Sequence, residues 1–131
     1  MSDALGILVC DTAAVVDGGP GMRFPVRAYG QDATGFVVRH AGTAYGWLNR
    51  CAHVPVELDG FHGEFFESEK KYLMCSMHGA LYLPDTGACV GGPCRRGRLH
   101  PIAVHERDGR IYWQPDAHIQ PRAAAGQGGQ A

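Results

Sequence analysis

The 131-residue chain contains two short boxes that each pair a cysteine with a histidine. The first box is Cys51-Ala52-His53 and the second is Cys75-Ser76-Met77-His78. Zinc fingers usually take both cysteines from one box and both histidines from the other, whereas each box here offers one sulfur and one nitrogen. A binuclear iron–sulfur cluster with two chemically different irons needs both kinds of ligand, because thiolates hold one iron and imidazoles hold the other. Zinc is chemically competent with the same four side chains, and the spacing alone does not exclude it.

Short apolar segments, each bounded by glycine, proline or aspartate, must position these boxes. The dipeptides Ala41-Gly42 and Asp108-Gly109 predict tight hairpins, and residues 11–16 could form one helical turn after an Asp N-cap. With 19 glycines and 8 prolines, the chain is predicted to be all-β, a sandwich or a barrel. Segments rich in β-branched and aromatic residues predict strands, at residues 5–10, 22–29, 35–40, 44–48, 71–75, 81–83, 102–106 and 110–114.

The two boxes and the residues after them resemble the Rieske [2Fe-2S] domain, specifically the small Rieske-type ferredoxins of bacterial aromatic-ring dioxygenase systems. The resemblance covers about residues 5–114 and implies an antiparallel β-sandwich with a small cluster-binding subdomain, whose loops span about residues 49–94. It also implies one [2Fe-2S] cluster per chain, with Cys51 and Cys75 on one iron and His53 and His78 on the other. The motifs that carry it are Cys51-x-His53, Cys75-x-x-His78-Gly79-Ala80-x-Tyr82, Thr86-Gly87 and Gly91-Gly92-Pro93, the last being the turn expected to cover the cluster.

Several positions depart from the family pattern. The 21 residues 54–74 between the boxes are more than is usual, and we expect the extra length in a protruding acidic hairpin or loop at 59–69. Val56 and Met77 stand where respiratory Rieske proteins have a bracing disulfide. Ala80 stands where high-potential members have a serine, while Tyr82 keeps a possible donor toward a cysteine sulfur. Fewer hydrogen bonds to the cluster disfavour its reduced state, so we expect a reduction potential of roughly −150 mV.

Three cysteines lie outside the boxes. Cys10 ends an apolar segment and is expected to be a small buried hydrophobe. Cys89 and Cys94 flank a Val-Gly-Gly-Pro turn, and their spacing would allow a disulfide if the turn brings them together. In a reducing compartment we expect free thiols instead, and a role in redox sensing or in bracing the loop stays open.

Composition and charge exclude several classes of partner. Twelve basic and thirteen acidic residues give a net charge of −1, so we expect neither a nucleic acid nor an anionic membrane surface as a partner. The apolar runs are shorter than the ~18 to 20 residues of a membrane span. The first basic residue is Arg23, whereas a secretory signal peptide starts with a basic region. We therefore expect a cytoplasmic protein.

The function implied by the resemblance is that of an electron carrier and not of an enzyme in its own right. No Gly-x-Gly-x-x-Gly and no assignable 2-His-1-carboxylate motif is present. We expect one domain over residues 1–116, followed by a flexible tail at 117–131 that is poor in apolar side chains. The expected partners are a reductase that supplies electrons and a terminal oxygenase that receives them. The alternatives are a small or regulatory Rieske-fold subunit of a larger reductase and a zinc-stabilised binding module.

Overall fold

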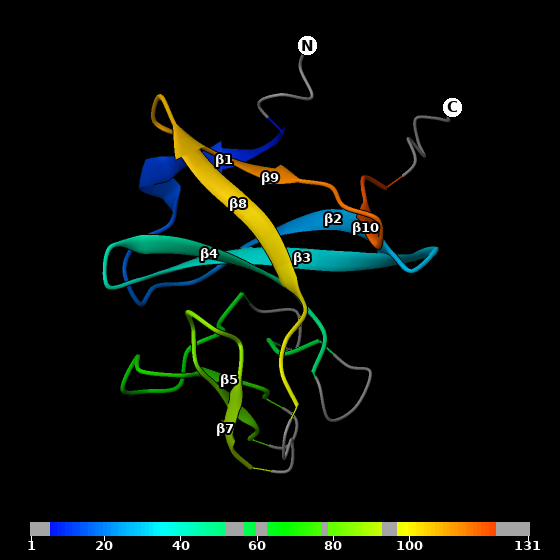
Figure 1. Ribbon diagram of the computed structural model, residues 1–131. Helices are drawn as coiled ribbons and strands as arrows, with labels where there is room; N and C mark the ends of the chain where they lie inside the picture. Colours follow the sequence, from blue (N-terminus) through cyan, green and yellow to red (C-terminus); the bar gives the residue numbers. More distant parts are fainter. Residues whose placement is uncertain (1–5, 52–56, 60–62, 77–78, 93–96, 123–131) are drawn as a thin grey trace.

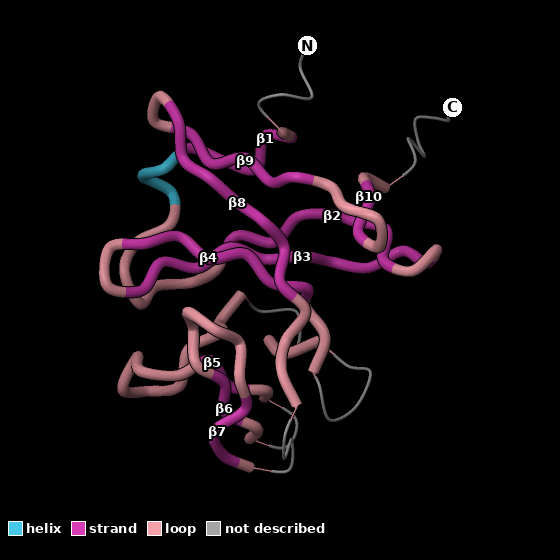
Figure 2. The backbone as a smooth tube through the Cα atoms, viewed as in Figure 1, coloured by secondary structure: helices cyan, strands magenta, loops and turns pink. Residues whose placement is uncertain are grey.

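The computed structural model describes residues 6–51, 57–59, 63–76, 79–92 and 97–122. This part of the chain contains two antiparallel sheets and a 3-10 turn at Thr12–Ala14 (Figures 1 and 2). No helix in the described ranges is long and apolar enough to cross a membrane. The strands are β1 Ile7–Asp11, β2 Met22–Ala28, β3 Gln31–His40, β4 Thr43–Leu48, β5 Leu73–Met74, β6 Leu81–Tyr82, β7 Cys89–Gly91, β8 Pro101–Arg107, β9 Arg110–Gln114 and β10 Ile119–Gln120.

The larger sheet folds over at β8 to make the two layers of a sandwich. Its strand order is β1-β9-β8-β4-β3-β2-β10. The start of β8 pairs with β4 through Ile102 and Gly46, whereas the rest of β8 pairs with β9 from Ala103 to Arg107. Figure 1 shows β8 crossing from one layer to the other above the small β5-β6-β7 sheet. The predicted all-β antiparallel sandwich with a small subdomain is confirmed.

Strand β3 supplies both cores of the molecule. Residues 35–38 are buried without interruption, which is typical of a strand covered on both faces. Alternate side chains point to opposite faces of a sheet, so Val37 packs inside the sandwich. Phe36 and Val38 pack on the other face, against the small subdomain. This apolar run is what joins the sandwich to the loops that carry the two boxes.

Both predicted hairpins are present, and a third was missed. Arg39 pairs with Ala44 across Ala41-Gly42, and Arg107 pairs with Arg110 across Asp108-Gly109. The missed turn joins Ala28 to Gln31 through Tyr29-Gly30. The predicted strands at 22–29 and 35–40 left residues 30–34 unassigned, so they did not indicate this hairpin. The predicted helical turn is a 3-10 turn after Asp11, whose side chain makes no capping hydrogen bond.

The predicted flexible tail begins too early. Ile119 and Gln120 form β10, which pairs with Ala28 and Arg27 of β2, and Ile119 is fully buried in the sandwich core. The Asp116 carboxylate accepts the backbone N–H groups of His118 and Ile119 at 2.8 and 2.9 Å. One apolar side chain and one turn-forming carboxylate therefore order a segment whose composition alone predicts disorder.

Arg39 fastens β3 to the N-terminal turn and to β8. Its Nε donates to the carbonyl oxygen of Val15 at 2.8 Å and its Nη2 to that of Thr12 at 3.3 Å. The guanidinium also forms an ion pair with Glu106. The hydrogen bond from Arg39 lowers the pKa of Glu106 below its ordinary value of 4.5, so the pair contributes stability when Glu106 is ionised.

We expect Glu106→Gln to lower the free energy of unfolding by up to about 1 kcal/mol at pH 7, since the pair is partly exposed. The loss should shrink as the pH falls below 4.5 and through the lowered pKa, because the wild-type carboxyl then loses its charge as well. Urea unfolding of both proteins followed by far-ultraviolet circular dichroism at pH 7 and pH 3.5 measures the difference. A gap of the same size at both pH values would contradict a role for the ion pair.

Candidate metal centre

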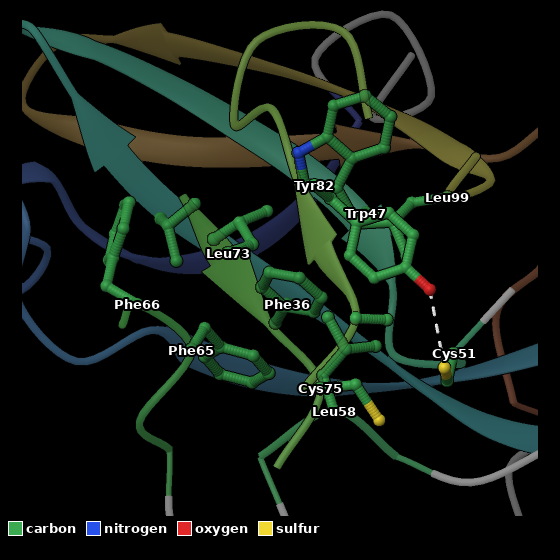
Figure 3. Packing of buried hydrophobic residues seen from close by; sticks show 12 residues of the cluster. Phe36, Trp47, Cys51, Leu58, Phe65, Phe66, Leu73, Cys75, Tyr82 and Leu99 are labelled. Carbon is green, nitrogen blue, oxygen red and sulfur yellow. Dashed lines mark hydrogen bonds between the residues drawn. The ribbon is translucent and has the colours of Figure 1, made fainter. Parts of the chain in front are cut away.

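The structure brings Cys51 and Cys75 into one buried apolar cluster. Cys51 lies shortly after the end of β4 and Cys75 directly after β5, and their exposed fractions are 4% and 0%. Figure 3 shows both side chains at the edge of this cluster, with Leu58 and Phe65 packed beside them. The other two predicted ligands, His53 and His78, lie outside the described residues.

Backbone hydrogen bonds join Cys75, the first residue of the second box, to the two residues that follow the box. The backbone N–H of Cys75 donates to the carbonyl oxygen of Ala80 at 2.9 Å, and that of Gly79 donates back to Cys75 at 2.9 Å. Gly79 has a φ of 75°, a left-handed conformation that glycine adopts at little cost. The left-handed backbone at this position therefore explains why a glycine follows the second box.

Tyr82 contacts the sulfur of the first box. It lies on β6, is fully buried, and its Oη is 3.3 Å from the Sγ of Cys51 (Figure 3). The predicted contact between Tyr82 and a cysteine sulfur is confirmed. When Cys51 is a thiolate the phenol must be the donor, because a thiolate has no proton to give.

The Gly91-Gly92 turn lies against the second box. Gly92 has a φ of 80°, and a Cβ atom there would come within 2.8 Å of the Cα of Ala80. Only glycine allows so close an approach of two backbones. The turn that the resemblance assigns to covering the cluster thus packs on the chain between Gly79 and Ala80, while Pro93 lies outside the described residues.

Trp47 joins the small subdomain to the large sheet. It extends from β4, and its indole Nε1 donates to the carbonyl oxygen of Pro84 at 3.0 Å. The adjacent turn is tied to the chain that leads into β8, because the N–H of Leu99 donates to Gly87 at 2.9 Å. The Thr86-Gly87 motif therefore lies where the small subdomain meets the large sheet.

The expectation of a free thiol at Cys89 is wrong, because this residue is disulfide-bonded. Its backbone N–H donates to the carbonyl oxygen of Gly97 at 2.9 Å, and Ala88 bridges to Arg98 in antiparallel fashion. These contacts hold Ala88 and Cys89 beside Gly97 and Arg98. Cys94, with which Cys89 was considered as a pair, lies outside the described residues.

The acidic segment between the boxes is more internal than predicted. Phe65 is 1% exposed and stacks on Phe36 with ring centroids 3.9 Å apart, so the base of the segment packs in the core. Its tip is a turn in which the Glu67 carboxylate accepts the N–H groups of Glu69, Lys71 and Tyr72 at 2.8, 2.9 and 3.2 Å. These donors lower the pKa of Glu67.

The donor set fits a thiophilic metal centre. Cys51 and Cys75 carry thiols and not a disulfide, and they are surrounded by apolar side chains and one phenol. Thiolates of this kind suit iron–sulfur clusters and zinc alike. Among the described residues, no three histidine, cysteine or carboxylate side chains form a complete site, so Cys51 and Cys75 are the two predicted ligands that the structure describes. Cys10 lies apart from them, half-buried against the sandwich core, and burial raises the pKa of its thiol.

Comparison with known proteins places this geometry in a family. The family model for the Rieske [2Fe-2S] domain matches residues 7–113. The ferredoxin of carbazole 1,9a-dioxygenase from Nocardioides aromaticivorans is 21% identical, with a TM-score of 0.65 over 84% of this chain and 97% of that one. A ferredoxin from Sphingomonas yanoikuyae is 22% identical, with a TM-score of 0.64 over 85% and 99%.

A third match is to a chain from the reduced complex between the oxygenase and the ferredoxin of carbazole 1,9a-dioxygenase. It is 20% identical, with a TM-score of 0.64, and the match covers 87% of this chain but 32% of that one. A search of curated proteins finds no match. The similarity to the solved structures shows a shared fold, and the family model accounts for almost all of the described residues.

We expect Cys89 to resist alkylation until a reductant is added, because its sulfur is already bonded. Denatured, unreduced protein treated with iodoacetamide should be modified at Cys10, Cys51 and Cys75 and not at Cys89. Peptide mapping by mass spectrometry before and after reduction measures this. Modification of Cys89 without reductant, to the same extent as Cys10, would contradict the disulfide.

Proposed function

Because the chain belongs to the Rieske [2Fe-2S] domain family, we propose that it carries single electrons from a reductase to a terminal oxygenase. The domain holds one [2Fe-2S] cluster per chain, which supplies one-electron chemistry when bound. The observation that carries the proposal is the buried pair Cys51 and Cys75, with the Tyr82 hydroxyl on the Cys51 sulfur. Relatives of the same fold are the ferredoxins of dioxygenase systems.

In this proposal the four ligands are Cys51 and Cys75 on one iron and His53 and His78 on the other. Leu58, Phe65 and Leu73 are at most 1% exposed and keep water from the cysteine side. The apolar surroundings make added negative charge costly, whereas the hydroxyl of Tyr82 donates to Cys51 and offsets part of that cost. Ala80 has no hydroxyl to offer, so the balance favours a low reduction potential.

A second candidate, the regulatory subunit with an acidic partner-binding segment, is less well supported. Glu57 is engaged by Arg23 at 2.6 Å, Asp59 is 2% exposed, and Glu67 caps its own turn. These carboxylates have roles within the chain. The zinc-stabilised module uses the same ligands as the proposed cluster, and metal analysis separates the two.

The visible spectrum of anaerobically purified protein, before and after dithionite, tests the proposed function. We expect a brown protein with about two irons and two sulfides per chain that bleaches on reduction. Iron, sulfide and zinc are quantified on the same sample, and cluster reconstitution is attempted on any colourless preparation. A protein that stays colourless, with zinc or without metal, would overturn the electron-carrier proposal.

We expect Tyr82→Phe to lower the reduction potential, because the sulfur of Cys51 loses a donor that stabilises the more negative reduced state. The expected shift is on the order of 60 mV, which for one electron corresponds to a tenfold change in the equilibrium constant. Redox titration followed by visible absorption measures it. Tyr112→Phe is the matched control, since Tyr112 stacks on His105 in the sandwich and its loss should leave the potential unchanged. Equal potentials in the two variants would contradict the role of Tyr82.

A further inference from the structure

We propose that Asn49 and Asp59 are positioning residues that fix the two cysteine-bearing loops relative to each other. The inference rests on the proposed function, because its consequence is the geometry of the bound cluster. Neither residue belongs to the two boxes, and neither is among the predicted ligands. They act through the backbone of Asn49 and Leu58, which lie before and after Cys51 in the chain, and through the backbone of Ser76, which follows Cys75.

Burial is the first sign of this role. Asn49 is 4% exposed and Asp59 is 2% exposed, and among the described residues they are the only buried amide and carboxyl side chains. A buried amide or carboxylate is costly unless hydrogen bonds replace those it made to water. Both residues lie beside the apolar cluster that holds the cysteines, so their hydrogen-bond partners are the informative contacts.

Asn49 closes the first loop. Its backbone N–H donates to the carbonyl oxygen of Thr34 on β3 at 2.7 Å, which anchors it to the large sheet. Its side-chain Oδ1 accepts the backbone N–H of Leu58 at 2.8 Å. The amide thus joins the two ends of the stretch between residues 49 and 58, which carries Cys51.

Asp59 sets the orientation of that amide. Its Oδ1 accepts from Nδ2 of Asn49 at 3.1 Å and its Oδ2 accepts from the backbone N–H of Gly63 at 2.8 Å. Arg23 of β2 lies on the same carboxylate, with Nε 3.6 Å from Oδ2. A carboxylate offers only acceptors, so the Asn49 amide must turn its nitrogen toward Asp59 and its oxygen toward Leu58.

The same segment reaches the second loop. The carbonyl oxygen of Leu58 accepts the backbone N–H of Ser76 at 2.8 Å, and Ser76 follows Cys75 directly. The connection therefore runs from Thr34 on the sheet through Asn49 and Leu58 to Ser76. A carboxylate on Asp59 keeps this chain of hydrogen bonds in a single arrangement.

Two substitutions test the proposal. Asp59→Asn keeps the shape but places an NH₂ group against an N–H donor, from either Asn49 or Gly63, and removes the charge facing Arg23. Asn49→Ala removes the closing amide and changes no charge. Partners outside the ligand set commonly change metal affinity 10- to 100-fold, so we expect each variant to release iron to a chelator at least about tenfold faster than wild type. The electron paramagnetic resonance spectrum of the reduced protein should broaden, because the ligands no longer hold one geometry.

Glu106→Gln is the matched control. It also breaks an ion pair of a partly buried arginine, but at the junction of β3 and β8, away from the loops. We expect its iron release to stay within about twofold of wild type and its spectrum to be unchanged.

The outcomes are distinguishable. Release rates and spectra of both variants equal to those of Glu106→Gln, on a wild type that holds its cluster, would overturn the positioning role. A wild-type protein without iron and sulfide would instead overturn the proposed function. If Asp59→Asn does not fold, Asn49→Ala decides the question, since it introduces no mismatched donor.

Discussion

The burial of β3 on both of its faces is the constraint on which the rest of the molecule depends. Val37 belongs to the sandwich core, while Phe36 and Val38 belong to the core that holds the cysteines. A strand with both faces covered cannot shift by one residue without exchanging the two sets of side chains. The register of β3 therefore sets where the first box begins, because β4 pairs with β3 and ends shortly before Cys51.

The small subdomain has little regular structure of its own to hold it together. Its sheet consists of β5, β6 and β7, which contribute two or three residues each. Short strands of this kind are not stable alone, so the loops depend on apolar contacts with Phe36 and Trp47. Hydrogen bonds of polar side chains add to these contacts. The Tyr82 hydroxyl contacts the sulfur of Cys51, and the indole of Trp47 donates to the carbonyl oxygen of Pro84. The side chain of Asn49 accepts the backbone N–H of Leu58.

The sequence predicts features that depend on neighbouring residues better than features that depend on contacts between distant segments. The Ala41-Gly42 and Asp108-Gly109 hairpins are local, and both are present as predicted. The Tyr82 contact follows from the family pattern, and the structure confirms it. β10 depends on which distant segments pair, because Ile119 pairs with Ala28, and composition holds no record of that pairing. The assignment of Cys51, His53, Cys75 and His78 as ligands stays a prediction.

The acidic segment shows why charge counts mislead. Asp59 and Glu67 look alike in the sequence, yet one is buried beneath Arg23 and Asn49 and the other folds the tip of a turn. Their roles depend on which backbone N–H groups face them, and a one-dimensional pattern does not contain this information. From the sequence alone, Asp59, which binds Asn49 near the cysteines, could therefore not be distinguished from an acidic residue on the surface.

The two tryptophans lie in different cores, so each can serve as a fluorescent probe of one half of the molecule. Trp47 lies in the core around the cysteines and Trp113 lies in the sandwich core, and the chain has no other tryptophan. The fluorescence of each indole therefore reports on a different half of the protein. A single-tryptophan form would distinguish melting of the loop region from melting of its β-scaffold, which a probe averaged over the whole backbone merges into one signal.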